Sequence, residues 1–318
     1  MQLNLSTFNS SRYLLVFAVS VALLFLALIS GSEWLIRTRV QTSASGVDPK
    51  TWYLNLFRSS ASTQVVFGDS YVAQGIHGLG GFVNLAYPGG NVELLEARVL
   101  AYFRDKTPRQ VIIQADPQMF ASLKEGKDIS DEVALLASHQ TPRPRYLLWL
   151  FENPHRGLIF SYWRRYLMRQ RLGNQVALRP DGGIVDTDVW GTIPEETRMI
   201  GARGIVLTDT PMADVAVSRS GRAYERSLSF LEEKGAEVCM IGMPMTQEYL
   251  ALRSLTPEFE EATRWIRSLA ARHRFQYVDF SDSVADPNLF ANQNHLNARG
   301  AAVFTPMVKS KCFAVHTE

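Results

Sequence analysis

Short apolar segments alternate with longer amphipathic segments along most of the chain. The short segments mostly end at Gly, Pro, Asp or Asn, as strands do, and they are Gln64–Phe67, Phe82–Ala86, Gln110–Ala115, Glu237–Gly242 and Gln276–Phe280. The longer segments have the spacing of helices, and they are Val92–Phe103, Arg222–Lys234 and Pro257–Arg274. This alternation predicts an α/β fold, a three-layer αβα sandwich around a mostly parallel five-stranded sheet.

One apolar segment near the amino terminus is too long to be a strand. Tyr13–Ile29 holds seventeen residues without a charge, and a transmembrane helix needs roughly 20, with about 17 as the lower limit. Arg12 precedes the segment, and Trp34 follows it as an interfacial anchor. The alternatives are a buried core helix and a cleaved signal peptide, whose apolar region usually has about 7–15 residues before a small-residue cleavage site. We therefore expect residues 1–39 to be a short tail and an uncleaved transmembrane anchor.

The rest of the chain divides into a tether and one domain. Residues 40–63 are polar and mixed, and we interpret them as a tether with an entry helix around Trp52–Phe57. Residues 64–318 form the expected domain, with an insertion at about 120–220 where the strand–helix alternation stops. Within it, Pro142–Gly173 is aromatic and basic. This segment is either a surface for a partner, lipid headgroups or an anionic glycan, or an amphipathic helix packed on the core.

Composition excludes some classes of function. Lys and Arg number 33 against 31 Asp and Glu, so the net charge is only +2 and no nucleic-acid partner is expected. Cys239 and Cys312 are the only cysteines, and neither a metal site nor a cofactor is expected. Because Cys239 lies in an apolar segment, we expect a buried, inert thiol there, with a disulfide to Cys312 left open.

The first chemical motif is Gly68-Asp69-Ser70, between the first strand and a helical pattern. This position places Ser70 at the start of a helix beyond the carboxyl edge of the sheet, where backbone N–H groups favour developing negative charge. Gly68 allows the sharp turn, and Asp69 can cap the helix. The simpler interpretation of Ser70 is an ordinary N-cap serine.

The second motif is near the other end of the chain. His295 lies in a loop after the last strand, and Asn297 is placed to cap the helix that follows. Because the carboxyl ends of parallel strands meet at one edge, His295 would face Ser70 there. A serine hydroxyl is hardly ionised at neutral pH and needs such a base. The simpler interpretation is a surface histidine.

Two further turns offer candidate oxyanion donors. Gly89 follows the second strand in a Pro-Gly-Gly turn, and Gln114 ends the third strand. Bare backbone at such positions can present N–H groups to an oxyanion. Gly89, Gln114 and Asp69 are therefore the candidate oxyanion and binding residues. The simpler interpretations are a strand-to-helix turn at Gly89 and a strand end closed by Pro117 after Gln114.

The order of these motifs resembles the SGNH (GDSL) hydrolase superfamily, whose four blocks supply Ser, Gly, Asn and His. The resemblance spans residues 64–300 and implies that Ser70 is the nucleophile, Gly89 the second-block glycine and His295 the catalytic histidine.

This chain departs from the superfamily pattern at two blocks. The usual Gly-x-Asn-Asp is Gln114-Ala115-Asp116-Pro117 here, so the oxyanion hole must differ. The usual Asp-x-x-His has Asn292 in place of the acid. Asn292 is then the expected orienting residue, and Asp286 and Asp282 are alternatives.

The anchor, the insertion and the changed third block resemble one branch of the superfamily. That branch contains anchored proteins of alginate, cellulose and peptidoglycan O-acetylation and of teichoic-acid D-alanylation. It implies acyl transfer, O-acetyl transfer first of all, through acyl-Ser70 to a cell-surface or exported polysaccharide. A multi-spanning membrane-bound O-acyltransferase would be the partner that donates the acyl group. An anchored carbohydrate esterase or deacetylase, and a catalytically silent glycan-binding or scaffold domain, remain as alternatives.

The same resemblance implies a location. The chain would cross the bacterial cytoplasmic (inner) membrane once, in contact with the lipid bilayer, and place its soluble domain on the periplasmic side. The count of basic residues points the other way, since Arg12 stands before the anchor and Arg37, Arg39 and Lys50 after it.

Overall fold

The computed structural model describes residues 10–35, 49–137 and 177–313. The chain divides into two compact units, residues 1–48 with 143–173 and residues 49–142 with 174–318. The helix α1 (Ser10–Leu35) is the described part of the first unit. All other described elements belong to the second unit.

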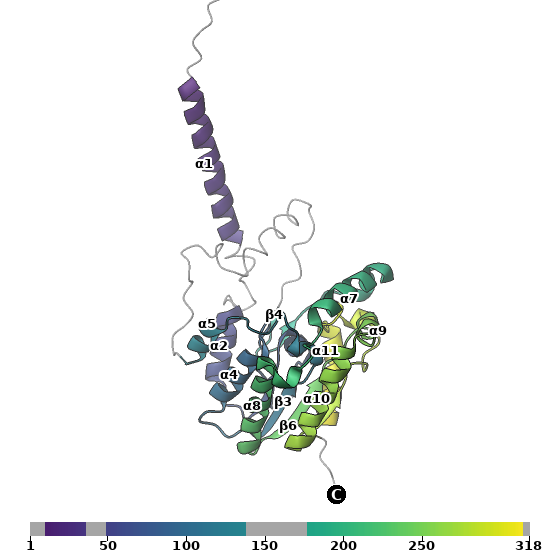
Figure 1. Cartoon of the computed structure of the whole chain (residues 1–318). Helices are drawn as coiled ribbons and strands as arrows, with labels where there is room; N and C mark the ends of the chain where they lie inside the picture. The colour runs from purple at the N-terminus through teal and green to yellow at the C-terminus, as the bar shows by residue number, and fades with distance from the viewer. Residues whose placement is uncertain (1–9, 36–48, 138–176, 314–318) are drawn as a thin grey trace, which may run out of the picture. The chain divides into compact units, whose positions relative to one another are not determined.

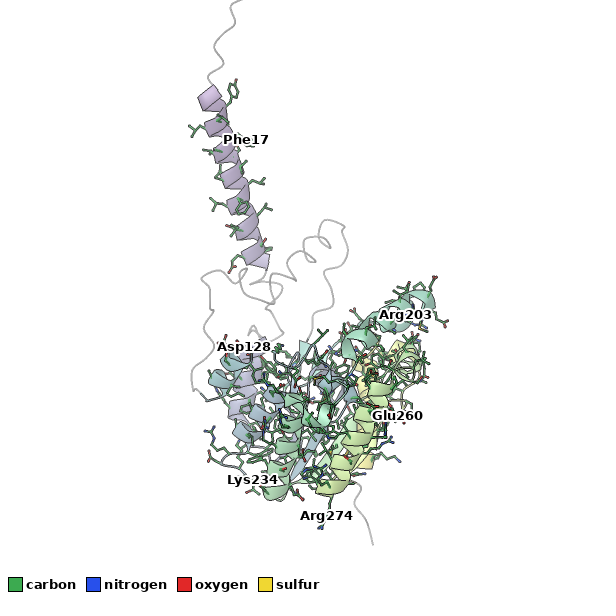
Figure 2. All side chains as sticks on the ribbon, viewed as in Figure 1. Phe17, Asp128, Arg203, Lys234, Glu260 and Arg274 are labelled. Atoms are coloured by element: carbon green, nitrogen blue, oxygen red, sulfur yellow. A yellow bond between two sulfur atoms is a disulfide. The ribbon has the colours of Figure 1, made fainter. Side chains whose placement is uncertain are left out.

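The helix α1 is apolar on all sides. Its segment Tyr13–Trp34 has 22 residues with a mean hydropathy of 2.7, which is long and apolar enough to cross a membrane. Most of its large apolar side chains are exposed, and Phe17 is 68% exposed (Figure 2). The expected N-terminal apolar helix is therefore confirmed as a helix, and it fits a single-pass membrane protein.

The domain is built on a sheet of five parallel strands. Its order is β2-β1-β3-β6-β7, and all neighbouring pairs are parallel. The strands are β1 (Gln64–Phe67), β2 (Val83–Asn84), β3 (Gln110–Gln114), β6 (Glu237–Gly242) and β7 (Gln276–Asp279). The predicted parallel five-stranded sheet is confirmed.

Alternate residues of each strand point to opposite faces of this sheet. Helices cover both faces. On one face, Val65 and Phe67 pack with α4 (Val92–Tyr102), α8 (Arg219–Glu233) and α10 (Pro257–His273), which lie side by side in Figure 1. On the other face, Val66 and Ile112 pack with α3 (Ser70–Gly75) and α11 (Ala298–Cys312). The predicted αβα sandwich is therefore confirmed.

The second face also contains a disulfide. Cys239 of β6 is bonded to Cys312 at the end of α11, with their Cα atoms 5.5 Å apart. The expected inert thiol at Cys239 is therefore wrong. Cys239 is buried as predicted, but its side chain points to the face covered by α11, which brings the two sulfur atoms together.

Between β3 and α8 the described elements lie outside the main sheet. They are η2 (Pro117–Phe120), α5 (Ser130–Ala137), β4 (Ala177–Leu178), β5 (Ile184–Val185), η4 (Trp190–Thr192), α7 (Glu195–Asp209) and η5 (Val215–Val217). The strands β4 and β5 form a separate antiparallel pair. The aromatic and basic segment Pro142–Gly173 lies outside the described residues, so its role stays a prediction.

Three further elements of the domain lie among the described residues. The helix α2 (Pro49–Ser59) matches the predicted entry helix and buries Tyr53 and Phe57. The helix α9 (Gln247–Arg253) follows β6, and the short helix η6 (Pro287–Leu289) precedes the loop that contains His295.

Candidate active site

The turn after β1 places Ser70 at the carboxyl edge of the sheet. Strands β1 and β3 are neighbours, and the chain continues from them in opposite directions across the sheet, to β2 and to β6. Open α/β sheets usually bind ligands at such a switch point. Gly68 is needed in this turn because a Cβ atom there would lie 2.6 Å from both Gln114 Oε1 and Val72 Cγ2. Ser70 is half-buried and therefore reachable.

Asp69 caps the helix that Ser70 begins. Its Oδ1 accepts a hydrogen bond of 3.0 Å from the N–H of Tyr71, as predicted, and Lys124 Nζ lies 3.5 Å from its Oδ2. The N–H of Asp69 donates to Gln114 Oε1 at 2.7 Å. Asp69 is therefore used to hold the turn, and its own N–H is not available as an oxyanion donor.

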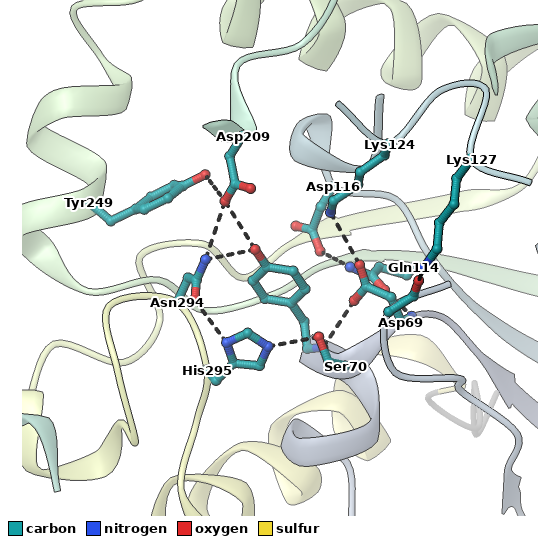
Figure 3. Close-up of polar contacts among 12 residues, drawn as sticks. Asp69, Ser70, Gln114, Asp116, Lys124, Lys127, Asp209, Tyr249, Asn294 and His295 are labelled. Atoms are coloured by element: carbon teal, nitrogen blue, oxygen red, sulfur yellow. Dashed lines mark hydrogen bonds and ion pairs between the residues drawn. The ribbon is translucent and has the colours of Figure 1, made fainter. Parts of the chain in front are cut away.

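The imidazole of His295 contacts the hydroxyl of Ser70 although 225 positions separate them. His295 Nε2 lies 2.8 Å from Ser70 Oγ (Figure 3). The Tyr71 ring stacks on the imidazole, with centroids 4.4 Å apart and planes 9° apart. Burial lowers the pKa of His295 to about 4, mainly because the imidazole loses its hydration. The charge of Asp69 raises this pKa, and the charge of Lys124 lowers it. His295 is thus neutral at physiological pH and can accept a proton.

The other ring nitrogen of His295 contacts two asparagines. Its Nδ1 lies 2.8 Å from Asn294 Oδ1 and 3.1 Å from Asn292 Oδ1. Both oxygens are acceptors, so Nδ1 is the protonated nitrogen and Nε2 is the one free to take the Ser70 proton. Asn292 Oδ1 also accepts from the N–H groups of Asn294 and His295, which fixes the local turn. Asn292 therefore lies at the expected orienting position, but Asn294 makes the shorter contact and was missed.

The alternative carboxylates do not approach His295. The carboxylate of Asp286 caps η6 by accepting from the backbone and side-chain nitrogens of Asn288. Within residues 49–137 and 177–313, no carboxylate accepts a hydrogen bond from His295. The assignment of Asp286 as the acid is therefore wrong, because its carboxylate is used to cap η6. The alternative Asp282 is not hydrogen-bonded to His295 either.

Gln114 and Gly89 have structural roles that explain their residue types. Gln114 is fully buried, and its Oε1 accepts from Asp69 while its Nε2 donates to Asp116 Oδ2 at 2.9 Å. Its side chain thus holds the turn at Asp69, and its role as an oxyanion donor stays a prediction. Gly89 has φ +71°, a left-handed conformation that favours glycine, and its carbonyl accepts from Lys127 Nζ. The role of Gly89 as an oxyanion donor stays a prediction.

A buried carboxylate lies behind the asparagines. Asp209 Oδ2 accepts hydrogen bonds from Tyr71 Oη at 3.0 Å, Tyr249 Oη at 3.1 Å and Asn294 Nδ2 at 3.2 Å (Figure 3). Burial raises the pKa of Asp209. The sequence does not point to Asp209, because this residue belongs to the segment interpreted as an insertion, where no motif marks it. Within the described ranges, no cluster of three or more His, Cys, Asp or Glu side chains could hold a metal ion.

The parallel sheet and the contact between Ser70 and His295 are what the resemblance to the SGNH superfamily predicts. The DltD family model, described as DltD protein, matches residues 214–305, from the end of the inserted segment through His295 into α11. The matched part is less than a third of the chain, and it agrees with the expected resemblance to the SGNH hydrolase superfamily.

Solved structures show a distant likeness. A GDSL-like lipase from Bacteroides thetaiotaomicron has a TM-score of 0.40 and 9% sequence identity, over 82% of this chain and 96% of that chain. A lipase/acylhydrolase from Enterococcus faecalis has a TM-score of 0.37 and 12% identity, over 78% and 95%. No curated protein sequence matches the chain.

Proposed function

We propose that this protein is a membrane-anchored O-acyltransferase that passes an acyl group, acetyl first of all, through Ser70 to a hydroxyl of a cell-surface or exported polysaccharide. The observation that carries the proposal is the 2.8 Å contact between Ser70 Oγ and the unprotonated Nε2 of a neutral His295. This pairing is what a serine needs to become a nucleophile at neutral pH.

The reaction has two stages. Ser70 Oγ attacks the acyl carbonyl carbon of the donor while His295 Nε2 takes the hydroxyl proton. The tetrahedral intermediate collapses, the leaving group takes that proton from His295, and the acyl group stays on Ser70. A sugar hydroxyl then gives its proton to His295 and attacks the acyl-serine, which releases Ser70 with its proton restored. Hydrolysis follows the same steps with water as the acceptor.

Acyl transfer, as opposed to hydrolysis, is supported by the DltD family match and by the membrane anchor. The DltD match agrees with the branch that contains teichoic-acid D-alanylation proteins. The apolar helix α1 would hold the domain at the membrane surface, next to a multi-spanning O-acyltransferase that donates the acyl group. The Cys239–Cys312 disulfide favours the oxidising, periplasmic side over the cytoplasm, against the count of basic residues.

The test uses the full-length chain in cells and in detergent. Ser70→Ala should abolish acyl incorporation into polysaccharide and labelling by a fluorophosphonate probe, whereas Ser268→Ala, an exposed serine on α10, should leave both unchanged. Normal acyl incorporation by Ser70→Ala would overturn the proposal. With purified protein, an acyl ester and an oligosaccharide, acyl groups should reach the sugar; release to water alone would identify an esterase instead.

A further inference from the structure

A chain of hydrogen bonds runs from the imidazole of His295 to the buried carboxylate of Asp209. His295 Nδ1 donates to Asn294 Oδ1 at 2.8 Å, and the other end of the same amide, Nδ2, donates to Asp209 Oδ2 at 3.2 Å. Asp209 is 7% exposed and ends α7. Figure 3 shows Asn294 between the two groups, with Asp209 on the side away from Ser70. An amide therefore stands between the base and a buried carboxylate.

The carboxylate decides which way this amide points. An amide side chain has a donor end and an acceptor end of almost the same shape, whereas an ionised carboxylate only accepts. Asp209 therefore holds the NH₂ group of Asn294, and the oxygen must face His295. The opposite orientation would place NH₂ against Nδ1, which would move the ring proton to Nε2. His295 could then no longer take the proton of Ser70.

Two tyrosines keep this carboxylate in place. The hydroxyls of Tyr71 and Tyr249 both donate to Asp209 Oδ2, at 3.0 and 3.1 Å. Burial raises the pKa of both tyrosines well above the ordinary value, so the hydroxyls remain donors. Tyr71 Oη also accepts from Asn294 Nδ2 at 2.7 Å while its ring stacks on His295. One tyrosine thus holds both the amide and the plane of the imidazole.

We infer that Asp209 and Asn294 are positioning residues for acyl transfer: Asp209 fixes the amide of Asn294, and Asn294 fixes the tautomer of His295. Together they take the place of the acid that Asn292 does not supply. The inserted segment then contributes to the site through α7, which ends at Asp209. This inference rests on the proposed function of Ser70 and His295.

The first measurement needs no substitution. Nitrogen-15 NMR of histidine-labelled full-length chain in detergent micelles reports which ring nitrogen carries the proton, and His295→Ala identifies the signal among the six histidines. The inference expects the Nδ1–H tautomer at neutral pH. A signal with the proton on Nε2 would overturn it. This measurement does not depend on turnover, so the inference can fail while the proposed function holds. Failure of the proposed function would show separately, as wild-type Ser70 that the fluorophosphonate probe does not label.

The second measurement is a rescue experiment. Asp209→Ala frees the amide, so Ser70 labelling by the fluorophosphonate probe should slow by roughly 10- to 100-fold, the range found when a partner that orients a metal-bound histidine is lost. Adding Asn294→Asp restores a fixed acceptor for Nδ1–H, so the double variant should label faster than Asp209→Ala alone. In the otherwise unchanged chain, Asn294→Asp should slow labelling, because it sets two carboxylates against each other.

A matched control separates positioning from simple support of the two helices. Glu248 of α9 pairs with Arg198 of α7, so Glu248→Gln weakens the contact between the same two helices without touching Asn294. It should lower thermal stability and leave the labelling rate unchanged. Labelling by Asp209→Ala at the wild-type rate, or a double variant no faster than Asp209→Ala, would overturn the inference.

Discussion

The low pKa of His295 predicts that the serine keeps its reactivity in mild acid. Only the neutral imidazole can take the Ser70 proton, so the reaction rate should follow the neutral fraction of His295 and rise with pH through its pKa. Burial and Lys124 lower that pKa to about 4, while Asp69 acts in the opposite direction. The perturbation is therefore a change of pH across the range in which an ordinary histidine titrates.

The expected size of the effect separates the two cases clearly. With a pKa of about 4, His295 is roughly 90% neutral at pH 5 and almost fully neutral at pH 7. A histidine with the ordinary pKa of about 6.5 would be roughly 3% neutral at pH 5 and about 76% neutral at pH 7. The labelling rate at pH 5 should then be about nine-tenths of the rate at pH 7, instead of about one twenty-fifth.

The assay is the initial rate of Ser70 labelling by a fluorophosphonate probe, which does not itself titrate between pH 4 and 8. Lys124→Gln removes a charge that lowers the pKa and should move the midpoint upward. Lys234→Gln, at the periphery of the domain in Figure 2, is the matched control and should not move it. A rate that halves near pH 6.5 in the unmodified chain would refute the reasoning, because the imidazole would then be hydrated like an exposed one.

Two further predictions concern the frame around the site. Replacing Cys239 and Cys312 together by Ala removes a bridge with a sequence separation of 73 residues, and it should lower the free energy of unfolding by about 2–4 kcal/mol in denaturant titrations; an unchanged midpoint would contradict the observed pairing. Gly68→Ala places a Cβ atom against Gln114 and Val72, so it should lower the free energy of unfolding by about 1–3 kcal/mol and greatly slow Ser70 labelling. Normal labelling would show that the turn accommodates a Cβ atom.

The strands could be predicted because buried parallel strands are continuous apolar segments. Gln64–Phe67 and Glu237–Gly242 have the expected bounds, and both lie inside the sheet. The predicted strand Phe82–Ala86 is shorter in the structure, where β2 covers only Val83–Asn84. It is an edge strand. It also contains the polar residue Asn84, whose Nδ2 donates hydrogen bonds to the carbonyls of Val72 and Ile76.

The sequence predicts which residues form the site only where these residues follow the ends of strands. Ser70 and His295 both follow strands of one parallel sheet, so topology brings them to the same edge. Gln114 also ends a strand, but position alone does not say that its amide turns toward Asp69. Asp209 and Asn294 meet across 85 positions and belong to no strand end, so only the folded chain reveals their contact.

The separation of carboxylate and imidazole by one amide has a consequence for how such proteins are recognised. A pattern search that demands an aspartate three residues before the histidine would class this chain as an inactive relative, because Asn292 stands there. A geometric search for a buried carboxylate two hydrogen bonds from the imidazole would retain it. Relatives that carry the same asparagine can be sorted in this way into those that keep a distant charge and those that have lost the charge altogether.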